Sequence, residues 1–284
     1  MKKTFSSKKS AFSLIELSIV LIIIGLLIAG VTGGASLIKS SELRAAISEA
    51  RGWSTAVNGF YNQFNAFPGD YNVAIGLPAG AAGNSNSQIN AYTLAANPSG
   101  IASKSDACAN ATSTAGCAYE DNVAWVQLKN AGVVDTNTVS APTLSLTGAT
   151  SFGVTNPQSK IKSSGWLFDY GSANGSTAGT NQFGQNVVIL SGAPSTTAMD
   201  ASNSYVNGAA SARVTGAITP ADALSIDTKV DDGKYNTGRI QGINPTAIYS
   251  AVGGAANCAG TLTTYNTTQT TKNCAISYQV DLNS

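Results

Sequence analysis

The chain has 284 residues, which is enough for one large or two small domains with a substantial hydrophobic core. Its 16 basic and 15 acidic residues give a net charge of +1, without the basic excess of nucleic-acid-binding proteins, so no nucleic acid is predicted as a partner. Histidine is absent, which excludes Ser-His and Cys-His nucleophile pairs. The sequence also contains neither a G-x-S-x-G elbow nor a phosphate-binding glycine motif. We predict that the chain is not an enzyme, with a pair of catalytic carboxylates as the enzymatic alternative.

An apolar segment occupies residues 12–38, and Glu16 is its only charged residue. The segment exceeds the roughly 20 residues that a helix needs to cross the hydrocarbon core of a bilayer. An acidic residue at the centre of such a helix costs about 2.5–3.5 kcal/mol, so Glu16 either snorkels to the interface or has a function. The residues before the segment include four basic ones and no acidic one: Lys2, Lys3, Lys8 and Lys9. By the positive-inside rule, we expect a cytoplasmic N-terminus, with the bulk of the chain outside the cytoplasm.

The order of these features resembles the class III signal of type IV pilins and type II secretion pseudopilins. A basic leader is followed by a small residue, Ala11, then by Phe12, three further residues, Glu16 and the apolar helix. The resemblance implies that a prepilin peptidase cleaves before Phe12 and commonly N-methylates the new terminus, and that the apolar segment is retained. The family usually has glycine at the position of Ala11.

The resemblance also implies an assembly role for Glu16. After cleavage, the ammonium group of Phe12 enters an apolar helix bundle, where an unpaired charge is far more costly than a paired one. In the family's filaments, the corresponding carboxylate neutralises the terminal amine of a neighbouring subunit. The implied partners are the membrane, prepilin peptidase, other pilin subunits, and a filament assembly platform with its ATPase. The implied location is the bacterial inner membrane, followed by a periplasmic or cell-surface filament.

Two alternatives are open at this point. The first lies within the resemblance: the filament is either a type IV pilus or a secretion pseudopilus, and the subunit is either major or minor, with the large globular part favouring a minor or specialised one. The second is a soluble exported binding domain with a conventional signal peptide cleaved after Ala35. The glutamate within the apolar segment, and the helix pattern that continues beyond it, count against this second alternative.

The helical pattern continues past the apolar segment to residue 64. Apolar residues recur at three- and four-residue steps, which is typical of an amphipathic helix that covers a core. These residues are Leu43, Ile47, Ala50, Trp53, Val57, Phe60 and Phe64. Pro68 and Gly69 then end the pattern, so residues 12–64 are predicted to form one helix about 80 Å long. The predicted organisation is a leader (1–11), a membrane or filament-core helix (12–38), an amphipathic second half (39–68) and an extracytoplasmic globular domain (69–284).

Within the globular domain, residues 76–117 form a low-complexity insertion that is poor in charge. The stretch "YEDNVAWVQLKNAGVVD" predicts a short helix, and "TPADALSI" predicts a second one capped by Thr219. Three segments predict strands: "GWLFDY", "NVVILSG" and "CAISYQVDL". The predicted fold class is α+β and pilin-like, with the long helix packed on a mainly antiparallel sheet. The blocks "FPGD", "AWVQLKNAG" and "ITPADALSIDTKVDDGKYNTG" also resemble segments of large prepilin-like proteins.

Four cysteines lie in the part of the chain predicted to be outside the cytoplasm, where disulfides persist. They are Cys108, Cys117, Cys258 and Cys274, and they allow three connectivities. Proximity in the sequence favours Cys108 with Cys117 and Cys258 with Cys274, each closing a short loop. A zinc site is the alternative, although the chain has no histidine and no Cys-x-x-Cys pair.

The stretch "IDTKVDDGKYNTG" is the richest polar cluster in the sequence. It contains Asp227, Asp231, Asp232 and Asn236, whose oxygens are the kind of ligand that calcium prefers. The resemblance adds that major pseudopilins carry a calcium loop near the C-terminus. The spacing differs from that of an EF-hand, and two nearby lysines offset the acidity. Calcium is therefore the possible cofactor, and a solvated turn stabilised by its own Asp and Asn side chains is the alternative.

Overall fold

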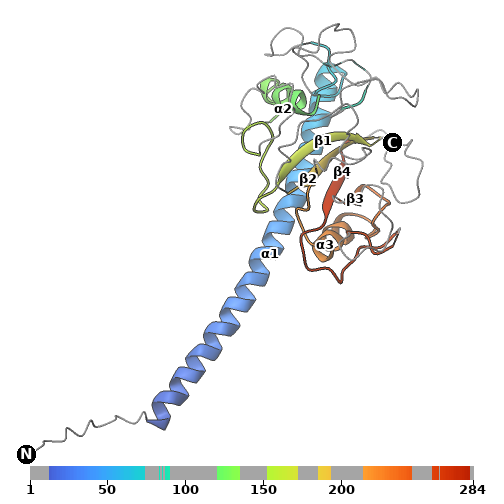
Figure 1. Ribbon diagram of the computed structural model, residues 1–284. Coiled ribbons are helices and arrows are strands. Elements are labelled where there is room, and N and C mark those ends of the chain that lie inside the picture. The colour runs from blue at the N-terminus through green and yellow to red at the C-terminus, as the bar shows by residue number, and fades with distance from the viewer. Residues whose placement is uncertain are drawn as a thin grey trace, which may run out of the picture. The chain divides into compact units, whose positions relative to one another are not determined.

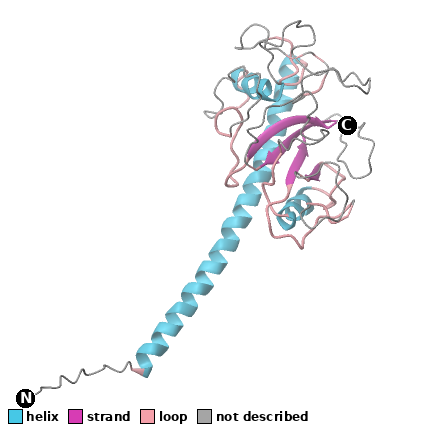
Figure 2. Ribbon diagram, in the orientation of Figure 1, coloured by secondary structure: helices cyan, strands magenta, loops and turns pink. Residues whose placement is uncertain are grey.

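The computed structural model describes residues 13–73, 83, 85, 87–89, 120–134, 152–171, 185–192, 214–244, 258–261 and 263–281. The chain divides into two compact units, Met1–Glu42 and Leu43–Ser284. The first unit contains the beginning of helix α1 (Leu14–Phe64). The second unit contains the rest of α1, two short helices and a sheet (Figures 1 and 2).

Helix α1 runs without interruption for 51 residues. The prediction of one long N-terminal helix ending at Phe64 is confirmed, and the described part begins at Leu14. The helix ends because Asn65 adopts a left-handed conformation, with φ of 51°, and the Pro68-Gly69 turn follows. Within the second unit, all but one of the buried side chains of α1 recur at steps of three and four residues: Leu43, Ala46, Ala50, Ser54, Val57 and Phe60, with Ala56 buried beside them. This half of the helix is therefore amphipathic, as predicted.

In the described part of the chain, the sheet has four strands in the order β1-β2-β4-β3, and every neighbouring pair is antiparallel. The strands are β1 (Gly165–Gly171), β2 (Gln185–Ser191), β3 (Ile240–Ile243) and β4 (Ala275–Gln279), and Figure 1 shows them side by side. The three predicted strand segments correspond to β1, β2 and β4. Only β3 was not predicted, because its four residues contain a glycine and give no sustained alternation. The predicted α+β, pilin-like architecture is confirmed.

Both faces of the sheet are buried. One face contributes Trp166, Phe168, Val188, Leu190, Ile240, Ile276 and Tyr278 to the main core, together with residues of all three helices. The other face contributes Leu167, Val187, Ile189, Ile243 and Ala275 to a second cluster. Burial on both faces explains why the central strand β2 is an apolar run rather than an alternating one.

The aromatic residues of α1 belong to the main core. Phe60 is fully buried, and Trp53 and Phe64 are partly buried against the same cluster. The Trp53 ring meets Trp125 of helix α2 (Glu120–Asn130) edge to face at 4.9 Å, and Trp125 stacks on Phe168 at 4.1 Å. The prediction that this face of the helix covers a core is confirmed.

Two polar side chains join these elements. Gln127 of α2 is fully buried, accepts a hydrogen bond from the Gly69 N–H at 2.7 Å and donates one to the Tyr71 carbonyl at 3.1 Å. The "FPGD" turn and the "AWVQLKNAG" helix, which are far apart in the sequence, are therefore in direct contact. Glu49 of α1 accepts hydrogen bonds from the Ser159 hydroxyl at 2.7 Å and from the Trp166 indole N–H at 3.0 Å. Glu49 therefore links the helix to strand β1.

Candidate functional site

The first candidate site is the N-terminal part of α1. Large apolar side chains between Leu14 and Ile38 are 46% to 84% exposed. Among the described residues, α1 is the one helix long and apolar enough to cross a membrane, with a mean hydropathy of 2.8 over a window with no buried residue. A signal sequence near an N-terminus would pass the same test. Because these side chains are exposed in the part of the chain that the structure describes, their apolar area is available for lipid or for another chain.

Glu16 lies in the first turn of α1. Its carboxylate Oε2 accepts a hydrogen bond from the Ser13 backbone N–H at 2.9 Å. The Ser13 hydroxyl in turn accepts a longer bond, 3.4 Å, from the Ile15 N–H. The sequence had predicted a partner for this carboxylate only in a neighbouring chain, whereas the structure also provides one within its own helix. Ala11 and Phe12, the predicted cleavage and methylation residues, lie outside the described residues.

A family model described as the prokaryotic N-terminal methylation motif matches residues 6–32. The chain carries the class III signal peptide of type IV pilins and pseudopilins. The match spans residues 6–11 of the predicted leader, the position of Glu16 and most of the exposed apolar surface of α1, so the resemblance seen in the sequence is confirmed. It supports a prepilin-like subunit and membrane anchoring through α1. Comparisons with curated proteins and with solved structures find no match.

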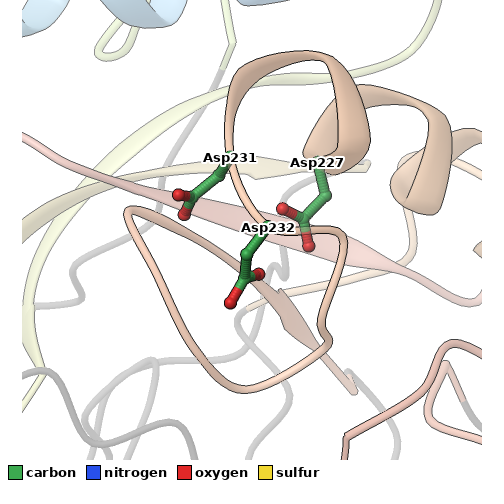
Figure 3. A group of neighbouring side chains, drawn as sticks. All are labelled: Asp227, Asp231 and Asp232. Atoms are coloured by element: carbon green, nitrogen blue, oxygen red, sulfur yellow. The ribbon is translucent and has the colours of Figure 1, made fainter.

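The second candidate site is the acidic loop, which we define as residues 227–239. It begins in the last turn of helix α3 (Pro220–Val230), whose first turn is capped by Thr219 as predicted, with the Thr219 hydroxyl accepting the Asp222 N–H. The carboxylates of Asp227, Asp231 and Asp232 converge, with one ligand atom from each lying within 4.8 Å of the others (Figure 3). Sequence reasoning thus grouped three residues that the fold brings together.

Each of these carboxylates also accepts hydrogen bonds from the chain. Asp231 accepts the backbone N–H groups of Arg239 and Ile240, which ties the end of α3 to the start of β3. Asp232 accepts the Lys234 N–H at 2.8 Å and the Thr237 hydroxyl. The carboxylates therefore stabilise the turn themselves.

Asp227 is the most deeply buried of the three, with no exposed surface. It accepts the Tyr265 hydroxyl at 2.8 Å and the Gly233 N–H at 3.2 Å. Burial raises the pKa of Asp227 to about 6, against the lowering effect of these two hydrogen bonds. A slight burial raises the pKa of Asp232, but hydrogen bonds from Thr237 and Lys234 outweigh it and leave that pKa below its usual value.

The residues of the acidic loop fit a hard cation in their chemistry. All candidate ligands are oxygens, and the buried Asn236 Oδ1 atom has no hydrogen-bond partner among the residues that the structure describes. A carboxylate oxygen that accepts one hydrogen bond keeps a second lone pair, so the bonds described above do not occupy the site completely. The donor set therefore permits calcium without requiring it, and calcium stays a prediction.

Tyr265 is the residue of this site that the sequence did not indicate. It lies 38 residues from Asp227, inside the loop closed by the Cys258–Cys274 disulfide, where the Cα atoms are 4.9 Å apart. Cys274 adjoins β4 and forms an antiparallel β-bridge with Ile218, the residue before the Thr219 cap. The disulfide therefore anchors the loop that contains Tyr265 beside α3. The bond uses both sulfurs, which leaves no zinc ligand in this pair. Cys108 and Cys117 lie outside the described residues.

Proposed function

We propose that the chain is a structural prepilin-like subunit, processed before Phe12 and polymerised through its N-terminal helix into a type IV pilus or pseudopilus-like filament. The observation that carries this proposal is an apolar helix surface with one acidic residue, Glu16. This residue lies within the methylation motif. Each large apolar side chain on that surface contributes about 1.5–3 kcal/mol when it is fully removed from water. A membrane supplies this burial before assembly, and neighbouring subunits supply it afterwards.

Glu16 has a specific part in this proposal. Cleavage creates an ammonium group at Phe12, and an uncompensated charge in an apolar bundle costs about 3–5 kcal/mol relative to a paired one. A carboxylate of a neighbouring subunit removes that cost only when the two helices have the correct axial offset. Pairing with Glu16 therefore favours one register of subunit packing.

The same proposal assigns a path to the subunit. The basic leader holds the N-terminus in the cytoplasm, where a prepilin peptidase removes residues 1–11, while the second unit folds outside the inner membrane. A platform protein and an assembly ATPase then move the subunit into a periplasmic or cell-surface filament. The role is structural, with no catalytic step assigned to the chain.

The N-terminal sequence and intact mass of the exported protein test the processing step. We expect a mature chain that begins at Phe12 and carries one methyl group on its amine. A chain that begins at Ser36 would contradict the proposal, because it would identify a conventional signal peptide and a soluble exported domain.

Substitution of Glu16 tests the assembly step. Glu16→Ala and Glu16→Gln both remove the negative charge, so we expect each variant to insert in the membrane and to accumulate there as unassembled subunit, without filaments. Ser18→Ala is the matched control, because it removes a polar side chain two residues away without changing the charge. Normal filament yield from Glu16→Gln would overturn the assembly role of the charge.

A further inference from the structure

The first turn of α1 contains the glutamate half of a capping box, the S-x-x-E arrangement in which the glutamate side chain accepts the backbone N–H of the serine that precedes the helix. Ser13 directly precedes the helix, and Glu16 is its third residue. The Glu16 carboxylate accepts the Ser13 N–H at 2.9 Å, and the Ser13 hydroxyl accepts the Ile15 N–H at 3.4 Å. Both bonds lie within the first unit of the chain and involve no other segment.

These bonds matter most in an apolar environment. The first four N–H groups of a helix lack partners within the helix, and in hydrocarbon no water is present to satisfy them. The positive end of the helix dipole also favours a negative charge in the first turn. Glu16 is therefore stabilised by its own helix in a subunit that has not yet met a neighbour.

We infer that Ser13 is a positioning residue for assembly: its N–H holds the Glu16 carboxylate in the unassembled subunit, and polymerisation exchanges this partner for the terminal ammonium group of a neighbouring subunit. This inference rests on the proposed filament function. The exchange keeps the carboxylate paired in both states, so the Glu16 charge is not left without a partner in the membrane. The free energy gained from the contact in the filament is therefore reduced by the free energy of the Ser13–Glu16 bond that is lost.

The bond within the subunit can be measured before assembly, on the full processed chain in detergent micelles. Labelling Phe at the carbonyl carbon with ¹³C and Ser with ¹⁵N selects Phe-Ser peptide bonds. Of the two in the sequence, Phe5-Ser6 is lost with the leader, so Phe12-Ser13 gives the only signal. Hydrogen exchange of the Ser13 amide then reports on its bond to Glu16.

We expect the Ser13 amide to exchange about tenfold more slowly in the wild-type chain than in Glu16→Ala, since a protected N–H exchanges only on local opening. Glu16→Gln should keep most of this protection, because glutamine also completes a capping box. Ser18→Ala should exchange like the wild type. Equal exchange rates in the wild type and in Glu16→Ala would overturn the bond within the subunit, whatever the filament yield.

The exchange of partners requires a second measurement, in filaments grown from a mixture of two subunit preparations. One is labelled with ¹⁵N at Phe, whose terminal amine resonates apart from all amides, and the other with ¹³C at Glu. We expect a through-space contact between the amine nitrogen and a Glu carboxylate carbon across subunits. In uniformly labelled filaments, the contact between the Ser13 nitrogen and the Glu16 carboxylate should be lost.

These outcomes separate the two proposals. An intersubunit contact together with a retained Ser13–Glu16 contact would overturn the exchange and leave the filament function intact. Normal filament assembly by Glu16→Gln would overturn the function assigned to the charge, even if the Ser13 amide is protected as expected.

Discussion

Replacing Glu49 should strongly destabilise the globular unit. Its carboxylate accepts hydrogen bonds from the Ser159 hydroxyl, the Lys160 N–H and the Trp166 indole N–H at 2.7, 3.0 and 3.0 Å. Hydrogen bonds to a charged group contribute about 1.5–3 kcal/mol each, and a buried donor left without a partner costs about 1–3 kcal/mol. Trp166 is only 1% exposed, so water cannot replace the lost acceptor fully. Allowing for non-additivity, we expect Glu49→Ala to lower the free energy of unfolding by about 3–5 kcal/mol.

The assay is urea denaturation of a soluble fragment of residues 39–284, followed by tryptophan fluorescence. Glu49→Gln should lower the free energy of unfolding by roughly 1–2 kcal/mol, because the glutamine oxygen still accepts a hydrogen bond while the glutamine NH₂ group faces other donors. Arg51→Ala is the matched control: it removes an exposed charge from the same helix and should change the free energy of unfolding by no more than about 0.5 kcal/mol. If Glu49→Ala were as stable as Arg51→Ala, the assignment of Glu49 as the link between α1 and β1 would be wrong.

The same fragment tests three further predictions. Replacing both Cys258 and Cys274 by serine should lower the free energy of unfolding by about 3 kcal/mol, as expected for a closed loop of ~15 residues, and non-reducing peptide mapping should recover the two cysteines in one fragment; a link from Cys274 to another cysteine would refute the pairing. Because burial raises the pKa of Asp227 from 3.8 to about 6, the native state takes up a proton between these values, and its stability should fall as the pH rises from about 4 to about 6. Asp227→Asn should remove that fall. If the melting temperatures of the two proteins changed in parallel from pH 4 to pH 7, the raised pKa of Asp227 would be contradicted. If calcium binds the acidic loop, millimolar calcium should raise the melting temperature relative to chelator, and the double substitution Asp231→Ala and Asp232→Ala should abolish the difference. An unchanged melting temperature with no heat of binding in calorimetry would remove the metal site.

The sequence predicted the elements whose patterns are long or strongly apolar. The helix ending at Phe64 followed from three- and four-residue spacing and a Pro-Gly stop, and strand β2 followed from an apolar run. Both signals are local, so they can be read without knowing what packs against them. The cap of α3 at Thr219 was likewise predictable, because a cap and its partner lie within one turn.

The missed features depend on contacts between distant segments. Glu49 lies outside the apolar stripe of the helix, yet it accepts hydrogen bonds from residues more than 100 positions away. Tyr265 lies in a threonine-rich loop, and nothing near it in the sequence points to Asp227. Among the described residues, strand β3 pairs with β4 alone, and its four residues become a strand because the disulfide-anchored β4 offers an edge. Periodicity carries no information on such pairings.

Glu16 is a different case. The sequence identified it by the cost of an acidic residue in a membrane helix, and the structure shows that this cost is only part of the explanation. The cost of about 2.5–3.5 kcal/mol for an acidic residue applies at the centre of a membrane helix. Glu16 lies instead in the first turn, where the Ser13 N–H donates a hydrogen bond to its carboxylate and the helix dipole favours a negative charge. Its presence in an apolar segment therefore does not by itself require a partner in another chain. The decisive comparison is between glutamate and glutamine at this position, because both can complete the capping box and only glutamate can neutralise an ammonium group. If the two variants assembled equally, Glu16 would act as a helix cap, and the register of the filament would have to come from apolar packing alone.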